Sequence, residues 1–156
     1  MKTKILSLFL VITIIMSLSS LALAADSTTQ IVTFEVQAVN DISVSGDPGP
    51  LVTIAGSSAT DNSTTYSITT NEANKKITGE LDADMPPNTT LEINLAAPTG
   101  ASSLGDVALS SAPADLVTGI GILSESGLAI TYTFTADVGA GVIASDTRTV
   151  TLTITD

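Results

Sequence analysis

Apolar and polar residues alternate with a period of two along most of the chain, a pattern typical of strands with one buried face. The clearest run closes the chain, where Val150, Leu152 and Ile154 alternate with threonines, and a second run covers 128–135. Glycine, proline, asparagine and aspartate separate the runs, and no long window has helical periodicity. The other candidate strands cover 30–44, 51–55, 65–70, 75–81, 89–95, 106–109 and 116–123.

Many short strands with frequent turn signals predict an all-β fold. We expect a single Ig-like or jelly-roll β-sandwich of about eight to ten strands in two packed sheets. No repeat of fixed period is visible, and 156 residues suit one domain. The core should be aliphatic, with Phe34, Tyr66, Tyr132 and Phe134 largely buried.

The first 24 residues have the features of a cleaved signal peptide. Lys2 and Lys4 precede an apolar stretch over 5–18, and Ala22-Leu23-Ala24 is an A-x-A cleavage signal. A membrane anchor is the alternative, but the stretch is shorter than the ~20 residues that a spanning helix needs. We therefore expect a secreted or cell-surface protein of prokaryotic origin, with no membrane span after cleavage.

Composition excludes most catalytic chemistry. The chain has no His, Cys or Trp, so thiol, imidazole and disulfide chemistry are absent, and we expect no enzyme activity. Cleavage would leave three basic residues against 16 acidic ones, a net charge of −13. This charge argues against a nucleic-acid partner. It opposes self-association at low salt but not at higher ionic strength.

The segment after the signal peptide keeps one apolar face for about a dozen residues, longer than the usual strand. Two interpretations are open. It is the first strand of its own sandwich, bent near Asn40 and Asp41, or it is a donor strand that enters a groove on the next subunit. The chain then divides into a signal peptide (1–24), an N-terminal strand segment and possible donor strand (25–45) and a β-sandwich domain (46–156). In the donor-strand interpretation, the residues that fill the neighbour's groove are Val32, Phe34, Val36 and Ala38, and Ile42 and Val44 begin the subunit's own core.

Three stretches are similar to secreted bacterial pilin-like sandwiches: 66–70, 81–95 with its Pro-Pro turn, and 140–154. The closing stretch resembles the terminal strand of spore-coat-protein-U-type domains. The apolar segment directly after the signal peptide resembles TasA-type matrix fibre proteins. The resemblance implies an extracellular fibre subunit. Coat-U-type domains usually carry a cysteine pair, which this chain lacks.

Asp82 and Asp84 are the weak candidate ligands for a metal. They precede the turn at Pro86 and Pro87, and Ca²⁺ takes carboxylate and carbonyl oxygens from such loops. The spacing lacks the glycine and the bidentate glutamate of an EF-hand loop, and acidic turn residues are the commoner explanation. Apart from calcium, we expect no cofactor.

We therefore expect an extracellular structural protein that self-associates into a homopolymer by strand exchange, as a subunit of a surface filament, pilus or biofilm matrix. The alternative is a monomeric secreted or cell-surface domain for adhesion or ligand binding, with an unidentified partner on the cell surface. A loop-lined groove with aspartates would favour the binding domain. A sandwich that lacks a strand and has a detached N-terminus would favour the fibre.

Overall fold

The computed structural model describes residues 26–156, so the predicted signal peptide lies outside the described residues. The chain divides into two units, Met1–Glu35 and Val36–Asp156. The described part of the first unit, residues 26–35, has no strand and exposes its side chains. The second unit is all-β, with nine strands and no helix among the described residues.

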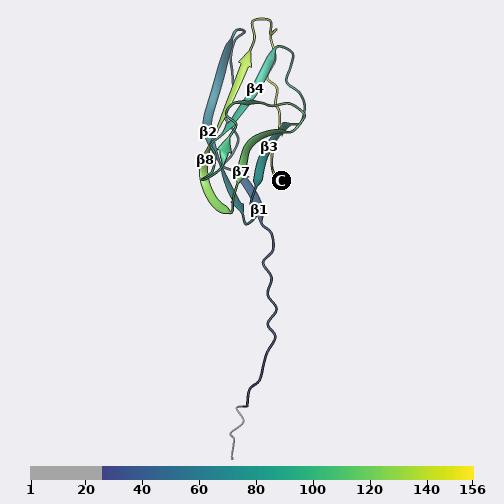
Figure 1. Cartoon of the computed structure of the whole chain (residues 1–156). Helices are drawn as coiled ribbons and strands as arrows, with labels where there is room; N and C mark the ends of the chain where they lie inside the picture. The colour runs from purple at the N-terminus through teal and green to yellow at the C-terminus, as the bar shows by residue number, and fades with distance from the viewer. Residues whose placement is uncertain (1–25) are drawn as a thin grey trace, which may run out of the picture. The chain divides into compact units, whose positions relative to one another are not determined.

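Two antiparallel sheets form the sandwich of the second unit (Figure 1). The five-stranded sheet has the order β1-β2-β8-β4-β6, and the four-stranded sheet has the order β5-β7-β3-β9. The expectation of an all-β fold in two sheets is confirmed. The strands of the first sheet are β1 (Asn40–Val44), β2 (Ser57–Thr70), β8 (Leu123–Ala136), β4 (Thr89–Leu95) and β6 (Val107–Ala108). Those of the second are β5 (Ser102–Ser103), β7 (Ala114–Ile120), β3 (Lys75–Leu81) and β9 (Val150–Thr155).

The period-two pattern determines β3 and β4. In β3, buried and half-buried residues alternate from Lys75 to Leu81, and β4 buries Leu91, Ile93 and Leu95. Both strands have the predicted bounds, because each alternating run lies between turn-forming residues that end the pairing.

Residues 60–63 lie between the candidate strands at 51–55 and 65–70, but they do not separate two strands. These residues lie inside β2, a strand of 14 residues that pairs with β8 from end to end. The register shifts between Asp61 and Thr64, so the polar run is accommodated by a β-bulge rather than by a chain reversal. Pairing with the equally long β8 overrides the local turn preference.

The core lies between the sheets and is mainly aliphatic. Tyr66 is buried and donates its hydroxyl hydrogen to the carbonyl oxygen of Ala96 at 2.5 Å. Burial, with a smaller contribution from the charge of Glu125, raises the pKa of Tyr66 to about 12. The buried core residues are Tyr66, Ile68, Ile77, Leu81, Leu91, Ile93, Leu95, Leu109, Leu116, Val117, Ile120, Ile130 and Tyr132.

The expectation that the four aromatic residues after residue 24 are buried is correct for Tyr66 and Tyr132 and wrong for Phe34. Phe134 is half-buried against the core, whereas Phe34 is 89% exposed. Phe34 lies among residues 26–35, which form no strand.

Different segments of the chain lie beside the two ends of the long β2–β8 pair. At one end Asn40 and Leu123 pair with Thr70, and at the other Ser57 pairs with Ala136. The start of the sandwich is fixed at the first end, where Asn71 Nδ2 donates to the carbonyl of Gln37 at 2.7 Å and Asn71 Oδ1 accepts from the N–H of Val39 at 2.8 Å. Towards the second end, the connection 46–55 runs from Ser45 beside Thr65 to Gly56 beside Ala136, and the connection 137–149 follows directly after Ala136.

Core packing predicts a large difference between two isoleucines. Ile93→Ala in β4 should destabilise the protein by about 2–5 kcal/mol, because Ile93 is fully buried. Ile122→Ala should change the free energy of unfolding by less than about 0.5 kcal/mol, because Ile122 is 72% exposed. Urea denaturation measures both. Equal losses from the two variants would contradict the placement of the core.

Candidate functional site

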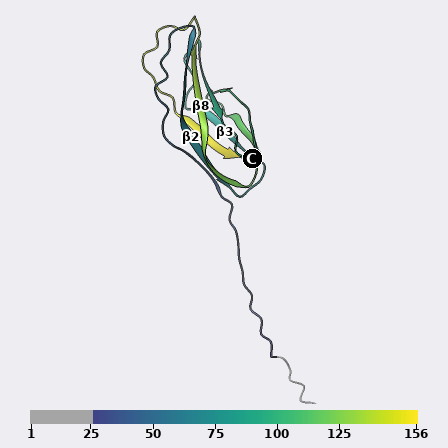
Figure 2. The same ribbon diagram turned by 90° about the vertical axis from the view of Figure 1, so that its left-hand side faces the viewer.

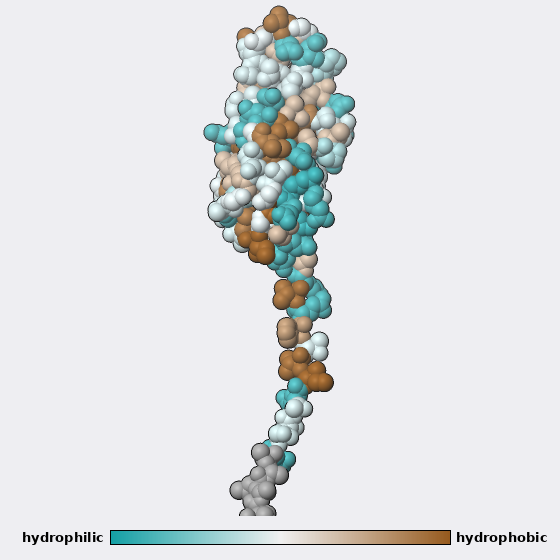
Figure 3. All heavy atoms as spheres, in the orientation of Figure 1, coloured by the Kyte–Doolittle hydropathy of each residue, from teal (hydrophilic) through white to brown (hydrophobic). Residues whose placement is uncertain are grey.

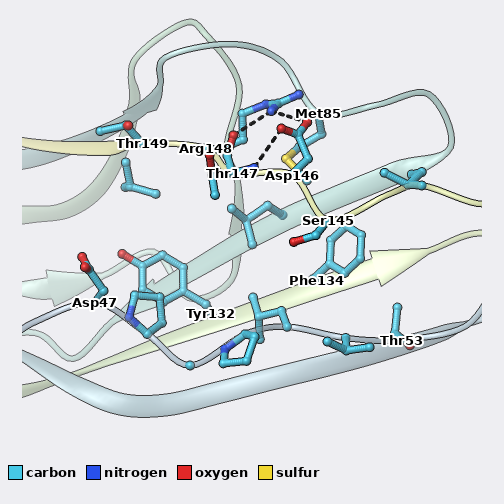
Figure 4. Close-up of a pocket in the computed structure, with 18 of the residues that line it drawn as sticks. Asp47, Thr53, Met85, Tyr132, Phe134, Ser145, Asp146, Thr147, Arg148 and Thr149 are labelled. Atoms are coloured by element: carbon cyan, nitrogen blue, oxygen red, sulfur yellow. Dashed lines mark hydrogen bonds and ion pairs between the residues drawn. The ribbon is translucent and has the colours of Figure 1, made fainter.

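A groove of about 1380 Å³ opens between the five-stranded sheet and two segments without regular structure. We call residues 46–55 the strap and residues 137–149 the second loop. Both lie on the same side of the sandwich (Figure 2), and the groove separates them (Figure 4). The groove exceeds the ~300–1,000 Å³ of typical small-molecule sites. Its size suits an extended chain segment better than a small ligand.

The floor of the groove is apolar. The inward faces of β4 and β8 form it, where Tyr132 and Phe134 lie opposite the second loop (Figure 4). Met85, from the turn before β4, and Leu152 of β9 extend the apolar lining. The floor residues of the first sheet are Leu91, Ile130, Tyr132, Phe134 and Ala136.

One polar group in this lining has no partner. The Oγ1 atom of Thr64 is buried and has no hydrogen-bond partner among the described residues. Thr64 is 4% exposed and lies at the bulge of β2. A buried hydroxyl without a partner is costly, so Thr64 is a place where an occupant of the groove could supply a hydrogen bond.

The strap follows an extended course but pairs with no strand, so the predicted strand at 51–55 is wrong. Leu51 packs against the core and Thr53 is half-buried, whereas Val52 and Ile54 are 82% and 75% exposed. The alternation is that of a strand with one inward face, but the strap forms no ladder of hydrogen bonds.

Free strand edges flank the groove. Among the described strands, β9 pairs only with β3, so its other edge has no backbone partner. On the opposite sheet, the short β1 covers only the half of β2 from Tyr66 to Thr70. Both β1 and β9 line the groove, which therefore offers backbone donors and acceptors as well as apolar side chains.

The rim of the groove carries charge. Arg148 donates to Asp146 Oδ2 at 2.7 Å (Figure 4). It also donates to the carbonyl of Asp84 at 3.2 Å, and the two bonds hold the second loop. The bond from Arg148 holds the pKa of Asp146 below its ordinary value. Across the groove, burial, with a smaller contribution from the charge of Asp47, raises the pKa of Tyr132.

The predicted donor-strand residues lie outside the strands of the sandwich. Val32, Phe34 and Val36 are 75%, 89% and 86% exposed, and Ala38 is also exposed. Figure 3 shows hydrophobic side chains along this segment. Their role in a neighbouring subunit stays a prediction.

A strand of the same chain begins at Asn40, the residue that interrupts the apolar pattern. Beyond it, Ile42 packs against the core of its own chain, and Val44 is 53% exposed.

The structure places Asp82 and Asp84 in hydrogen bonds that hold loops. Asp82 Oδ1 accepts from the N–H of Thr149 at 3.0 Å, and Asp84 Oδ1 accepts from the N–H of Ser111 at 2.7 Å. The bonds from Ser111 lower the pKa of Asp84. Within residues 26–156, no group of three or more potential metal ligands from His, Cys, Asp and Glu is found. The calcium site stays a prediction.

Comparison with protein-family models, curated proteins and solved structures found no match to this chain. The resemblance to pilin-like sandwiches therefore rests on the residue pattern alone. In the part of the chain that the structure describes, no helix is long and apolar enough to cross a membrane.

Sequence reasoning expected a groove but did not locate it, and it missed the roles of Arg148 and Thr64. Arg148 was visible as one of only three basic residues after residue 24. Nothing in the sequence indicates that Thr64 is buried without a partner, because this depends on the bulge in β2.

The two aspartates give a test of calcium against a purely structural role. Asp82→Asn with Asp84→Asn should lower the melting temperature to the same extent in calcium and in chelator, because both carboxylates accept backbone hydrogen bonds. Thermal denaturation in the two buffers measures this. A loss of stability only in calcium would contradict the structural role and support the metal site.

Acidification should weaken the same loops. The folded-state pKa of Asp84 is lowered, so its stabilising contribution is present above the ordinary aspartate pKa of about 3.9 and is lost as the pH falls through the lowered value. Asp84→Asn should therefore be less stable than the unmodified protein at pH 7, and the difference should shrink at acidic pH. Urea denaturation across the pH range measures it. A difference independent of pH would contradict this assignment.

Proposed function

We propose that the protein is a secreted structural subunit whose N-terminal segment enters the groove of a second copy and builds an extracellular filament, pilus or biofilm matrix. One observation carries the proposal. The same chain has an apolar segment without a sheet and an apolar groove beside an unpaired strand edge.

The segment and the groove are chemically complementary. The segment presents apolar side chains on one parity, with Val32, Phe34 and Val36 exposed in its own chain. The groove offers the apolar floor around Tyr132 and Phe134. Transfer of a large apolar side chain from water into such a floor is worth roughly 1.5–3 kcal/mol. Several such transfers offset the cost of ordering the segment.

Strand addition would also give the unpaired backbone groups of β9 hydrogen-bond partners. A donor strand beside β9 would pair with the edge that β3 does not reach. It would convert the four-stranded sheet into a five-stranded one and complete an Ig-like or jelly-roll sandwich in trans. The hydroxyl of Thr64 would gain a partner from the incoming chain or from a water held by it.

Within the second unit, the point where the chain enters the sandwich and the loops that line the groove lie at different places, which favours a linear polymer. The chain enters this unit at Gln37–Val39, beside Asn71, at the end of the β2–β8 pair that contains Thr70. The strap runs along the other half of the pair, from Ser45 beside Thr65 to Gly56 beside Ala136, and the second loop leaves β8 at Ala136. A contact between different surfaces of successive copies is heterologous, and it forms open filaments when the rotation between copies does not close a ring.

A monomeric adhesion or ligand-binding domain is the second candidate. The aspartates Asp47 and Asp146 on opposite sides of the loop-lined groove favour it. In this candidate the groove holds a ligand from outside the chain, and residues 26–39 only link the sandwich to its surroundings.

A single charge in the segment separates the two candidates. Phe34→Asp should abolish filaments and leave a folded monomer, because it would bury a charge in the groove of the next subunit. The matched control is Thr33→Asp, on the other parity, which should still form filaments. Negative-stain electron microscopy and sedimentation at moderate salt measure assembly.

Filaments from the Phe34→Asp variant would overturn the proposal. Monodisperse particles from the unmodified protein, with the sandwich folded, would favour the ligand-binding domain instead.

A further inference from the structure

We infer that the strap, residues 46–55, is a displaceable cover of the acceptor groove, which forms one wall of the groove in a free subunit and moves aside when a donor strand from another copy enters. This inference rests on the proposed function and adds a regulatory step to it. The strap would keep a free subunit soluble and delay assembly until a donor segment competes for the groove.

The strap is held weakly along its length. Two hydrogen bonds hold it among the described residues. The N–H of Gly49 donates to Asp61 Oδ2 at 3.3 Å, and the N–H of Ser57 donates to the carbonyl of Ile54 at 3.1 Å. Backbone groups that lack a protein partner must bind water, so lifting the strap sacrifices few hydrogen bonds.

Its two ends can act as hinges. Gly46 has a φ of 156° and Gly56 a φ of 80°, values that residues with a side chain rarely adopt. A Cβ atom at Gly46 would meet no atom within 4 Å, so backbone conformation rather than lack of space explains glycine at this position. The flexible ends flank a stiff centre that contains Pro48 and Pro50.

The strap fills the groove poorly. Leu51 is its one large side chain that packs against the core, and Val52 and Ile54 face solvent. A space of about 1380 Å³ and the unpartnered Thr64 hydroxyl remain. A donor segment with Val32, Phe34 and Val36 on one face would bury more apolar surface than Leu51 does, so exchange of the strap for the donor is favourable.

A disulfide across the strap tests this step. Position 49 of the strap faces position 61 of β2, because a Cβ atom built on Gly49 would lie 3.0 Å from Asp61 Oδ2 and 4.0 Å from its Cγ. The test therefore combines Gly49→Cys with Asp61→Cys, and loss of free thiol on oxidation confirms that the bond has formed before assembly is measured. The chain has no cysteine of its own, so no other disulfide competes. Oxidation of the full mature double variant should abolish filaments, and reduction should restore them. The single variants Gly49→Cys and Asp61→Cys, treated in the same way, are the controls.

Each result has one meaning. Filaments from both oxidised and reduced double variant would overturn the displaceable strap and leave the filament proposal standing. Absence of filaments from the unmodified protein would overturn the filament proposal, and with it this inference.

If the double variant fails to assemble even when reduced, thiol labelling decides. In a Leu51→Cys variant, the thiol should be labelled slowly in the free subunit and faster in filaments, because Leu51 leaves the core. Val52→Cys is the matched control, exposed in the free subunit. Equal labelling rates of Leu51→Cys in subunit and filament would overturn the inference.

Discussion

The structure depends on a difference in length between its two sheets. β2 and β8 each have 14 residues, whereas β3 and β7 have seven and β9 has six. The short sheet therefore cannot cover the whole apolar face of the long one, and irregular segments line the remainder. Inward-facing residues such as Tyr132 and Phe134 need a cover all the same, because exposed apolar area is costly. The groove and the strap follow from this difference, whereas the free edge of β9 follows from its place at the end of the four-stranded sheet.

The acidic composition fits this arrangement. The 16 acidic residues lie on a chain with exposed apolar side chains in the strap, the second loop and the N-terminal segment. Like charges on separate copies repel at low ionic strength, which opposes non-specific association of these apolar surfaces. Paired strands and a buried aromatic ring are short-range contacts that screening leaves intact. In this account, salt therefore strengthens assembly, and the fit of the donor strand in the groove determines which surfaces associate.

The alternation of apolar and polar residues along the sequence predicted the strands that their own residues and flanking turns define. Residues 75–81 and 89–95 form β3 and β4 with the predicted bounds, because their apolar faces meet the core regularly. The polar run at 60–63 lies between two candidate strands of the sequence pattern, and only pairing with β8 keeps it in β2. Residues 51–55 alternate like a strand but have no partner. The groove arises from relative strand lengths, and no local pattern encodes it.

The central claim is that the N-terminal segment completes another copy rather than its own sandwich. The most direct measurement is disulfide formation in a chain that carries both Val32→Cys and Leu152→Cys, one in the segment and one in the groove lining. Oxidation under assembly conditions should give a ladder of covalent oligomers on a denaturing gel, because each segment reaches the groove of a neighbour. A covalently closed monomer, with no ladder at any protein concentration, would show that the segment packs in its own chain and would contradict the account.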